Sequence, residues 1–196
     1  MPKLFARLSA LALVLAAGCA PTSKPAPPPP PPAASHPIVG GASMYPDRTI
    51  FQNASTSADH RTLISAATAT GAAQTLSGQS AYTLFAPTDD AFRRLPNGTV
   101  EALMSPRSRP ELTALVNYHI VPGAKTRSQI LADVQAGGGS ASYRTQQGQM
   151  LRVRVEAGRI VLADPSGRRS AVTQADVTQS NGVLHVVDAV LIPAIL

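Results

Sequence analysis

The chain of 196 residues has a single cysteine, no tryptophan and only 4% aromatic residues. One cysteine excludes an internal disulfide, so no covalent cross-link stabilises the fold. With so few aromatic residues, a buried core has to consist mainly of Leu, Val, Ile and Ala. The charge balance is basic, with 17 Lys or Arg against 11 Asp or Glu. This surplus favours attraction to anionic lipid headgroups or polysaccharides.

Motifs for catalysis and metal binding are also missing. The four histidines, at positions 36, 60, 119 and 185, show no metal spacing such as His-Glu-x-x-His. There is no G-x-S-x-G nucleophile elbow, and the Gly-Gly-Gly-Ser at 137–140 lacks the lysine of a phosphate-binding loop. No basic run alternates with aromatic residues, as nucleic-acid binding would require. The sequence therefore predicts a protein that is not an enzyme and has no cofactor, metal or nucleic-acid partner.

The N-terminus is typical of a bacterial targeting segment. A basic start leads into an apolar run from Leu8 to Ala17, which is too short for a bilayer-spanning helix of about 20 residues. The run ends in Leu-Ala-Ala-Gly-Cys at 15–19, which resembles a lipobox. We therefore predict a lipoprotein signal peptide over 1–18 and lipidation of Cys19. The alternative is an ordinary secretory signal with an incidental cysteine, but a lone exposed thiol in an oxidising compartment would be a liability.

A proline-rich linker follows over 19–42, with six consecutive prolines at 27–32. Such a run favours the extended polyproline II conformation and forms a stiff spacer between a membrane and the domain predicted over 43–196. A ligand for a proline-binding module is the alternative. Ala20, rather than Asp, follows the cysteine, so we predict an exported protein anchored in the outer membrane, on its periplasmic or surface face.

The most informative stretch of the domain is Tyr82 to Pro96. Its first four residues are aromatic, β-branched or apolar and predict a strand, and Pro87 stops the ladder because it has no N–H to donate. Thr88 is a predicted N-cap for a short helix. Asp89 and Asp90 then lie in its first turn, where the helix dipole favours negative charge.

The remaining pattern predicts helices first and hairpins afterwards, which is an α+β domain. Helices are expected over 49–54, 89–95, 99–104, 110–119 and 126–131, and a further helix from Ser57 or Asp59 to about Thr70. Strands are expected over 151–155, 159–163, 169–173 and 183–192. His119 lies on the apolar face of its helix, and His185 interrupts an apolar run. We interpret both as structural histidines whose ring nitrogens bond to backbone groups.

Three ordered blocks of the sequence resemble the signature blocks of fasciclin-type (FAS1) domains. They are Thr-x-Phe-Ala-Pro-Thr-Asp-x-Ala-Phe at 83–92, Asn-Tyr-His-Ile-Val-Pro-Gly at 117–123, and the segment 176–193. The block residues that we assign to the structural motif are Thr83, Phe85, Ala86, Pro87, Thr88, Asp89, Phe92, His119, Asn181, Gly182, His185 and Asp188. The resemblance covers roughly residues 48–193. It implies the fasciclin fold, a seven-stranded β-sandwich or wedge with several short helices.

The resemblance also implies an adhesion or protein-binding module with an unidentified envelope or surface macromolecule as its partner. In animal relatives an Asp–Ile pair before the last block and the Tyr-His block are reported integrin-binding sites. The matching positions here, Asp176-Val177 and Tyr118-His119, are candidate partner-binding residues, and the arginine-bearing hairpin at 152–159 is a third candidate surface. The alternative function is a carrier or sensor of a small apolar ligand such as a lipid or pigment, which would need an apolar pocket.

Replacing Cys19 with Ser should release the protein from the membrane, because the lipid chain would be its only anchor. Mass spectrometry of the mature wild-type N-terminus should show a lipidated Cys19. An unmodified cysteine, or a Cys19→Ser protein that stays in the membrane fraction, would contradict the prediction.

Overall fold

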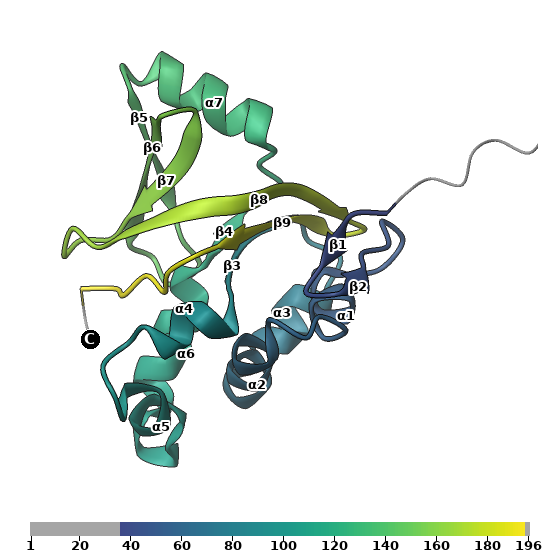
Figure 1. Cartoon of the computed structure of the whole chain (residues 1–196), viewed down its shortest axis with the longest axis vertical. Helices are drawn as coiled ribbons and strands as arrows, with labels where there is room; N and C mark the ends of the chain where they lie inside the picture. Colours follow the sequence, from purple (N-terminus) through teal and green to yellow (C-terminus); the bar gives the residue numbers. More distant parts are fainter. Residues whose placement is uncertain (1–35, 195–196) are drawn as a thin grey trace, which may run out of the picture. The chain divides into compact units, whose positions relative to one another are not determined.

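The computed structural model describes residues 36–194, which belong to one compact unit. The predicted signal peptide, Cys19 and the proline run lie outside the described residues. The helices are α1 (Ile50–Ala54), α2 (Arg61–Thr70), α3 (Ala72–Ser77), α4 (Asp89–Arg93), α5 (Thr99–Met104), α6 (Arg109–Tyr118) and α7 (Arg127–Ala136), with a short 3-10 helix at Pro106–Ser108. The strands are β1 (Ile38–Val39), β2 (Ala42–Ser43), β3 (Tyr82–Pro87), β4 (Ile120–Pro122), β5 (Ser140–Arg144), β6 (Met150–Glu156), β7 (Arg159–Ala163), β8 (Arg169–Gln179) and β9 (Gly182–Val187). This order confirms the predicted α+β class (Figure 1).

Seven of the strands form one sheet in the order β4-β3-β9-β8-β7-β6-β5. β3 and β9 are parallel, and every other neighbouring pair in this sheet is antiparallel. β8 joins two halves of the sheet, because its residues 169–171 pair with β7 and its residues 172–179 pair with β9. The register shifts between Val172 and Val177, and such bulges bend a strand and increase its twist. The strand number agrees with the seven-stranded sheet that the fasciclin resemblance implies.

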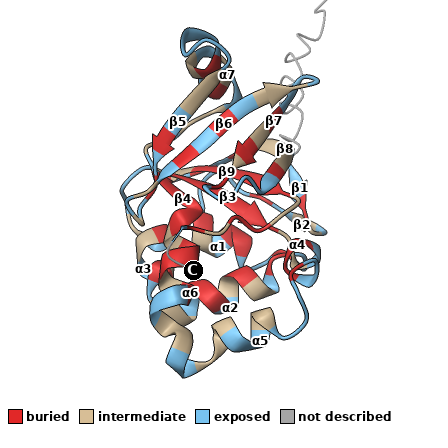
Figure 2. Ribbon diagram, turned by 90° about the vertical axis from the view of Figure 1, so that its left-hand side faces the viewer, coloured by how far each residue is buried: buried red, intermediate tan, exposed pale blue. Residues whose placement is uncertain are grey.

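Two hydrophobic cores lie on opposite faces of the central strands β3 and β9. Successive side chains of a strand point to opposite faces, so Leu84 and Leu184 enter the core under helices α1 to α6. Phe85 and Val187 enter the second core, which α7 and strands β5 to β7 cover. Buried residues accordingly follow these central strands and the inner sides of α2 and α6 (Figure 2).

The continuous apolar run that begins at Val183 is therefore buried on both faces, as predicted. The strand, however, ends at Val187 and not at Ile192. Leu191 is still buried in the second core, although it lies beyond the last strand. The sequence pattern does not distinguish a buried residue beyond the strand from a buried residue within it, because both positions favour apolar side chains.

Other boundaries also differ from the prediction. The helix predicted over 126–131 continues to Ala136, with Ile130 and Val134 buried one turn apart, so the strand period begins only at Ser140. The segment 120–122, for which the sequence pattern predicted no strand, is the short strand β4 at the edge of the sheet.

The start of α2 is built differently from the sequence expectation. His60, and not Ser57 or Asp59, occupies the N-cap position, and its side chain makes no capping bond. The backbone N–H of Thr62 instead donates to the carboxylate of Asp89 at 2.8 Å. A residue from the signature stretch therefore caps a helix 27 positions away in the chain, which no local pattern could show.

The compact unit also begins before the predicted domain boundary at 42/43. The hairpin of β1 and β2 lies in the segment assigned to the linker except for its last residue, Ser43, and Val39 is buried in the first core. The N–H of Ala58 donates to the carbonyl of Gly40 at 3.0 Å, which attaches the hairpin to the helical layer. The proline-rich composition hid this short hairpin.

Asn181 ties the turn between β8 and β9 to two helices. Its side-chain oxygen accepts from the N–H of Ile50 at 2.8 Å, at the start of α1. Its amide nitrogen donates to the carbonyls of Leu76 and Gly78, each at 2.8 Å, at the end of α3. The next residue, Gly182, packs so tightly on β3 that any Cβ would collide with the carbonyl oxygen of Tyr82.

Replacing Asn181 with Ala should lower the free energy of unfolding by about 3 kcal/mol, because two buried backbone groups and one partly buried backbone group lose their partner. Urea unfolding followed by circular dichroism measures this loss. The matched control is Ser180→Ala at the exposed neighbouring position, whose side chain makes no such bonds. Equal effects of the two substitutions would show that the Asn181 bonds do not stabilise the domain.

Candidate binding surface

The signature blocks meet at the segment between β4 and α7. Thr83 on β3 donates its hydroxyl to the carbonyl of Gly123 at 2.6 Å and accepts from the N–H of Lys125 at 2.8 Å. His185 on β9 donates from Nε2 to the carbonyl of Lys125 at 2.8 Å. Two motif residues from opposite ends of the domain therefore hold the same short segment.

His185 also receives a hydrogen bond from β8. The N–H of Asp176 donates to Nδ1 of the ring at 3.2 Å, which leaves the imidazole neutral with its proton on Nε2. Burial lowers the pKa of His185, and the Phe85 ring stacks on it with a centroid separation of 5.5 Å. A neutral ring with a hydrogen bond at each nitrogen is a structural part of the fold.

Asp176 caps α7. Its carboxylate accepts from the N–H of Arg127 at 2.6 Å, at the first residue of that helix. Its backbone lies in the left-handed region with φ of 58°, which Asp tolerates better than most residues. Asp176 therefore positions α7 through both its backbone and its side chain.

His119 has two backbone partners in the buried core. Nδ1 donates to the carbonyl of Leu115 at 2.9 Å, and Nε2 accepts from the N–H of Leu191 at 3.1 Å. Burial lowers the pKa of His119 to about 4. The ring therefore connects the end of α6 to the C-terminal segment in its neutral form.

The other motif residues have similar local roles. Thr88 accepts from the N–H of Ala91 at 3.2 Å and caps α4. Asp188 accepts from the N–H of Ala171 at 2.7 Å and fixes the start of β8 against the end of β9. Phe85, Ala86 and Phe92 are buried in the two cores.

The candidate partner-binding residues are mostly inaccessible. Tyr118, His119 and Val177 are fully buried, so their side chains do not reach a partner in the folded domain. Asp176 is exposed, but its carboxylate is engaged by α7. Three of the four positions that match the animal motif are therefore buried, and the fourth is bonded to the start of α7.

A serine and a histidine lie together at the start of α2, but they are not arranged for catalysis. Ser57 Oγ and His60 Nδ1 are 2.8 Å apart, and both residues are buried, with exposures of 3% and 1%. Nε2 of His60 has no hydrogen-bond partner in the described part of the chain. A substrate has no access to this pair, so it does not form a reactive site.

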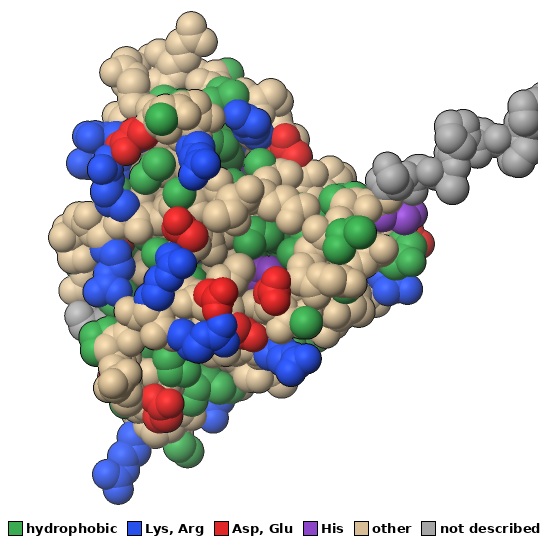
Figure 3. Space-filling view, in the orientation of Figure 1, with side chains coloured by type: hydrophobic (Ala, Val, Ile, Leu, Met, Phe, Trp, Pro, Cys, Tyr) green, Lys and Arg blue, Asp and Glu red, His purple; other side chains and the backbone are tan. Residues whose placement is uncertain are grey.

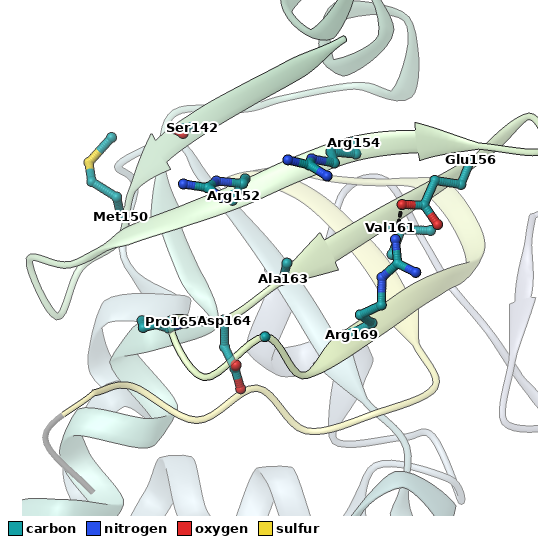
Figure 4. Close-up of a pocket in the computed structure, with 11 residues that line it drawn as sticks. Ser142, Met150, Arg152, Arg154, Glu156, Val161, Ala163, Asp164, Pro165 and Arg169 are labelled. Carbon is teal, nitrogen blue, oxygen red and sulfur yellow. Dashed lines mark hydrogen bonds and ion pairs between the residues drawn. The ribbon is translucent and has the colours of Figure 1, made fainter.

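An open groove of about 490 Å³ lies on the outer face of strands β5 to β8 (Figure 4). Along β6 the residues alternate, with Leu151 and Val153 buried and Arg152 and Arg154 exposed. Arg169 on β8 lines the other side of the groove and forms an ion pair with Glu156. This surface is the third candidate that the sequence suggested, now extended from the hairpin to β8.

Small side chains make the surface hollow beside the arginines. The register places Arg152 between Ser142 on β5 and Ala163 on β7. Arg154 lies in the adjacent row, next to Ser140 on β5. The guanidinium groups therefore border an open space, and among residues 36–194 neither has an ion-pair partner.

Comparison with known proteins identifies the class of protein to which this fold belongs. A FAS1 domain pair from the insect cell adhesion molecule fasciclin I superposes with a TM-score of 0.67 over 75% of this chain and 51% of that one. Its sequence is 19% identical, so this likeness concerns the fold alone.

The family follows from the sequence comparisons. The model of the Fasciclin domain matches residues 58–193, so the chain belongs to the fasciclin domain family. Protein sll1483 from Synechocystis is 35% identical over 156 residues, which are 80% of this chain and 79% of that protein. Human periostin is 33% identical over 112 residues, which are 57% of this chain but only 12% of periostin.

The pKa of His119 predicts a pH-dependent stability. Its value of about 4 in the folded protein lies below the ordinary value of 6.5, so between these pH values only the unfolded chain takes up the proton. The free energy of unfolding therefore has its full value above pH 6.5. It falls as the pH decreases from 6.5 to 4, and the contribution of His119 to this fall is about 3 kcal/mol. Burial lowers the pKa of His60 and of His185 as well, so these two act in the same direction.

Urea unfolding of the wild type and of His119→Gln between pH 4 and 8 tests this. Glutamine keeps one donor and one acceptor but does not titrate, so the variant should lose less stability on acidification. An identical pH dependence in both proteins would contradict the role of His119.

Proposed function

We propose that the protein is an exported, lipid-anchored binding module that attaches to a macromolecule through the groove on β5 to β8 and has no catalytic turnover. Its membership of the fasciclin family supports this, since a structural relative is named as a cell adhesion molecule. The open arginine-lined groove is the observation that carries the proposal.

The polar groups of the described domain favour binding over catalysis. The rings of His119 and His185 are bonded to backbone groups on both sides. Within residues 36–194 no three His, Cys, Asp or Glu side chains lie close enough to hold a metal ion. None of the helices described there is long and apolar enough to cross a membrane. The anchor in this proposal is the lipid on Cys19, which the lipobox-like Leu-Ala-Ala-Gly-Cys at 15–19 supports, and the proline-rich part of the predicted linker 19–42 is the spacer.

A carrier of a small apolar ligand is the alternative function. Such a protein needs a concave, mostly apolar pocket with a few polar groups. The groove carries Arg152, Arg154 and Glu156, and a second hollow of about 300 Å³ is lined by Arg127 and Arg159. Charged, open hollows of this kind favour a polar macromolecular partner.

The test compares cells that display the full-length protein with cells that display a chain ending after residue 42. Loss of the domain should abolish attachment to the partner surface and capture of envelope material, because the groove is lost with it. Adhesion assays and pull-down from the envelope fraction measure both effects.

Two outcomes would overturn the proposal. The full-length protein could capture no macromolecule, or it could co-purify with a lipid or pigment at a fixed ratio. The second outcome would establish the carrier function in its place.

A further inference from the structure

We propose that the partner in the groove is an acidic polysaccharide, held through its anionic groups by Arg152, Arg154 and Arg169. This inference rests on the proposed function and specifies the chemistry of the partner. Such polysaccharides have a hydrophilic chain with repeated carboxylate, sulfate or phosphate groups. The planar guanidinium group of arginine binds each of these anionic groups with two parallel hydrogen bonds.

The positive charge of the domain is concentrated in the segment that carries the groove. Residues 140–170 contain six arginines and two carboxylates, whereas the remainder of 36–194 contains eight Lys or Arg and nine Asp or Glu. One of the two carboxylates, Asp164, is buried, and the other, Glu156, pairs with Arg169. Lys and Arg side chains accordingly gather over β6 and β7 (Figure 3). An anionic chain would therefore find its strongest attraction here.

The spacing of the arginines fits several anionic groups better than one. Arg152 and Arg154 are two residues apart on one strand, about 7 Å along β6. The register aligns Arg152 with Ala163 and Ala163 with Arg169, so two strand spacings, about 10 Å, separate those arginines. In Figure 4 the side chains of Arg152 and Arg154 lie along β6, and Arg169 rises from β8 toward Glu156, so they do not converge on one point.

The lining favours a glycan over other anionic macromolecules. Protein interfaces bury aromatic and apolar anchors, but the only large exposed hydrophobic side chain lining this groove is Met150. Single-stranded nucleic acids stack on aromatic rings, and the groove lining contains none. A membrane surface would require apolar residues that insert beside the cations. A hydrophilic chain needs only the guanidinium groups and hydroxyls such as that of Ser142.

The experiment measures binding of the full-length protein, in detergent, to immobilised polygalacturonate, dextran sulfate and neutral dextran. Wild type should bind one or both acidic polymers and not the neutral one, and high salt should release it. Arg152→Ser with Arg154→Ser should weaken binding by about tenfold or more, because two charge-assisted contacts are lost. Serine suits these exposed strand positions, as Ser140 and Ser142 occupy the neighbouring positions on β5.

The matched control is Arg61→Ser with Arg107→Ser, which removes the same charge from exposed positions of the helical layer. It should retain at least about half of the wild-type affinity, because it weakens only the long-range electrostatic attraction to the polymer and removes no contact in the groove. Arg154→Gln alone serves as a milder variant if the double substitution lowers the melting temperature.

Equal weakening by the groove and control variants, or binding of neutral dextran as strong as that of the acidic polymers, would overturn the inference. Groove-dependent binding of poly-glutamate or of anionic vesicles without binding of either acidic polysaccharide would assign the groove to another partner. In all these cases the binding-module part of the proposed function survives if domain-dependent capture of envelope material persists, whereas equal weakening by the two variants would remove the groove from it. It fails separately if the displayed domain captures nothing.

Discussion

The imidazole of His185 is the constraint on which much of the structure depends. It accepts a hydrogen bond from the N–H of Asp176 on β8 and donates one to the carbonyl of Lys125 before α7. The ring itself is buried beside Phe85, so its two nitrogens depend on these backbone partners. One side chain on β9 therefore fixes the bulge of β8 and the path of the chain into α7.

The outer half of the sheet depends on that path. α7 packs on the inner side of β5, β6 and β7, where Ile130 and Val134 share a core with Leu151 and Val153. The bulge in β8 carries the sheet from the central strands to these outer strands. With one face covered by α7, the opposite face of β5 to β8 stays open and presents its arginines. The groove is thus a consequence of how the signature residues position α7.

The residues that hold this fasciclin domain together and the residues that line the groove are consequently different ones. The signature residues bond to backbone groups of neighbouring segments, which engages much of their polar surface. The groove residues make few contacts with the rest of the domain, and the Glu156–Arg169 pair is exposed enough to contribute little stability. Substitutions among the exposed groove residues are therefore expected to leave the fold intact.

The sequence by itself determined the α+β class, most helices and hairpins, and the family, because these depend on local periodicity, turns and contiguous blocks. It also indicated that His119 lies in an apolar environment, from its spacing to Leu112, Leu115 and Val116. It did not show that Asp89 caps α2 or that Asp176 caps α7, because those partners are distant in the chain. Only the tertiary structure decided that Val177 and Tyr118 are buried and that Arg152 and Arg169 border one groove. Strand register brings such residues together, and register is set by pairing across the sheet and not by neighbours in the sequence.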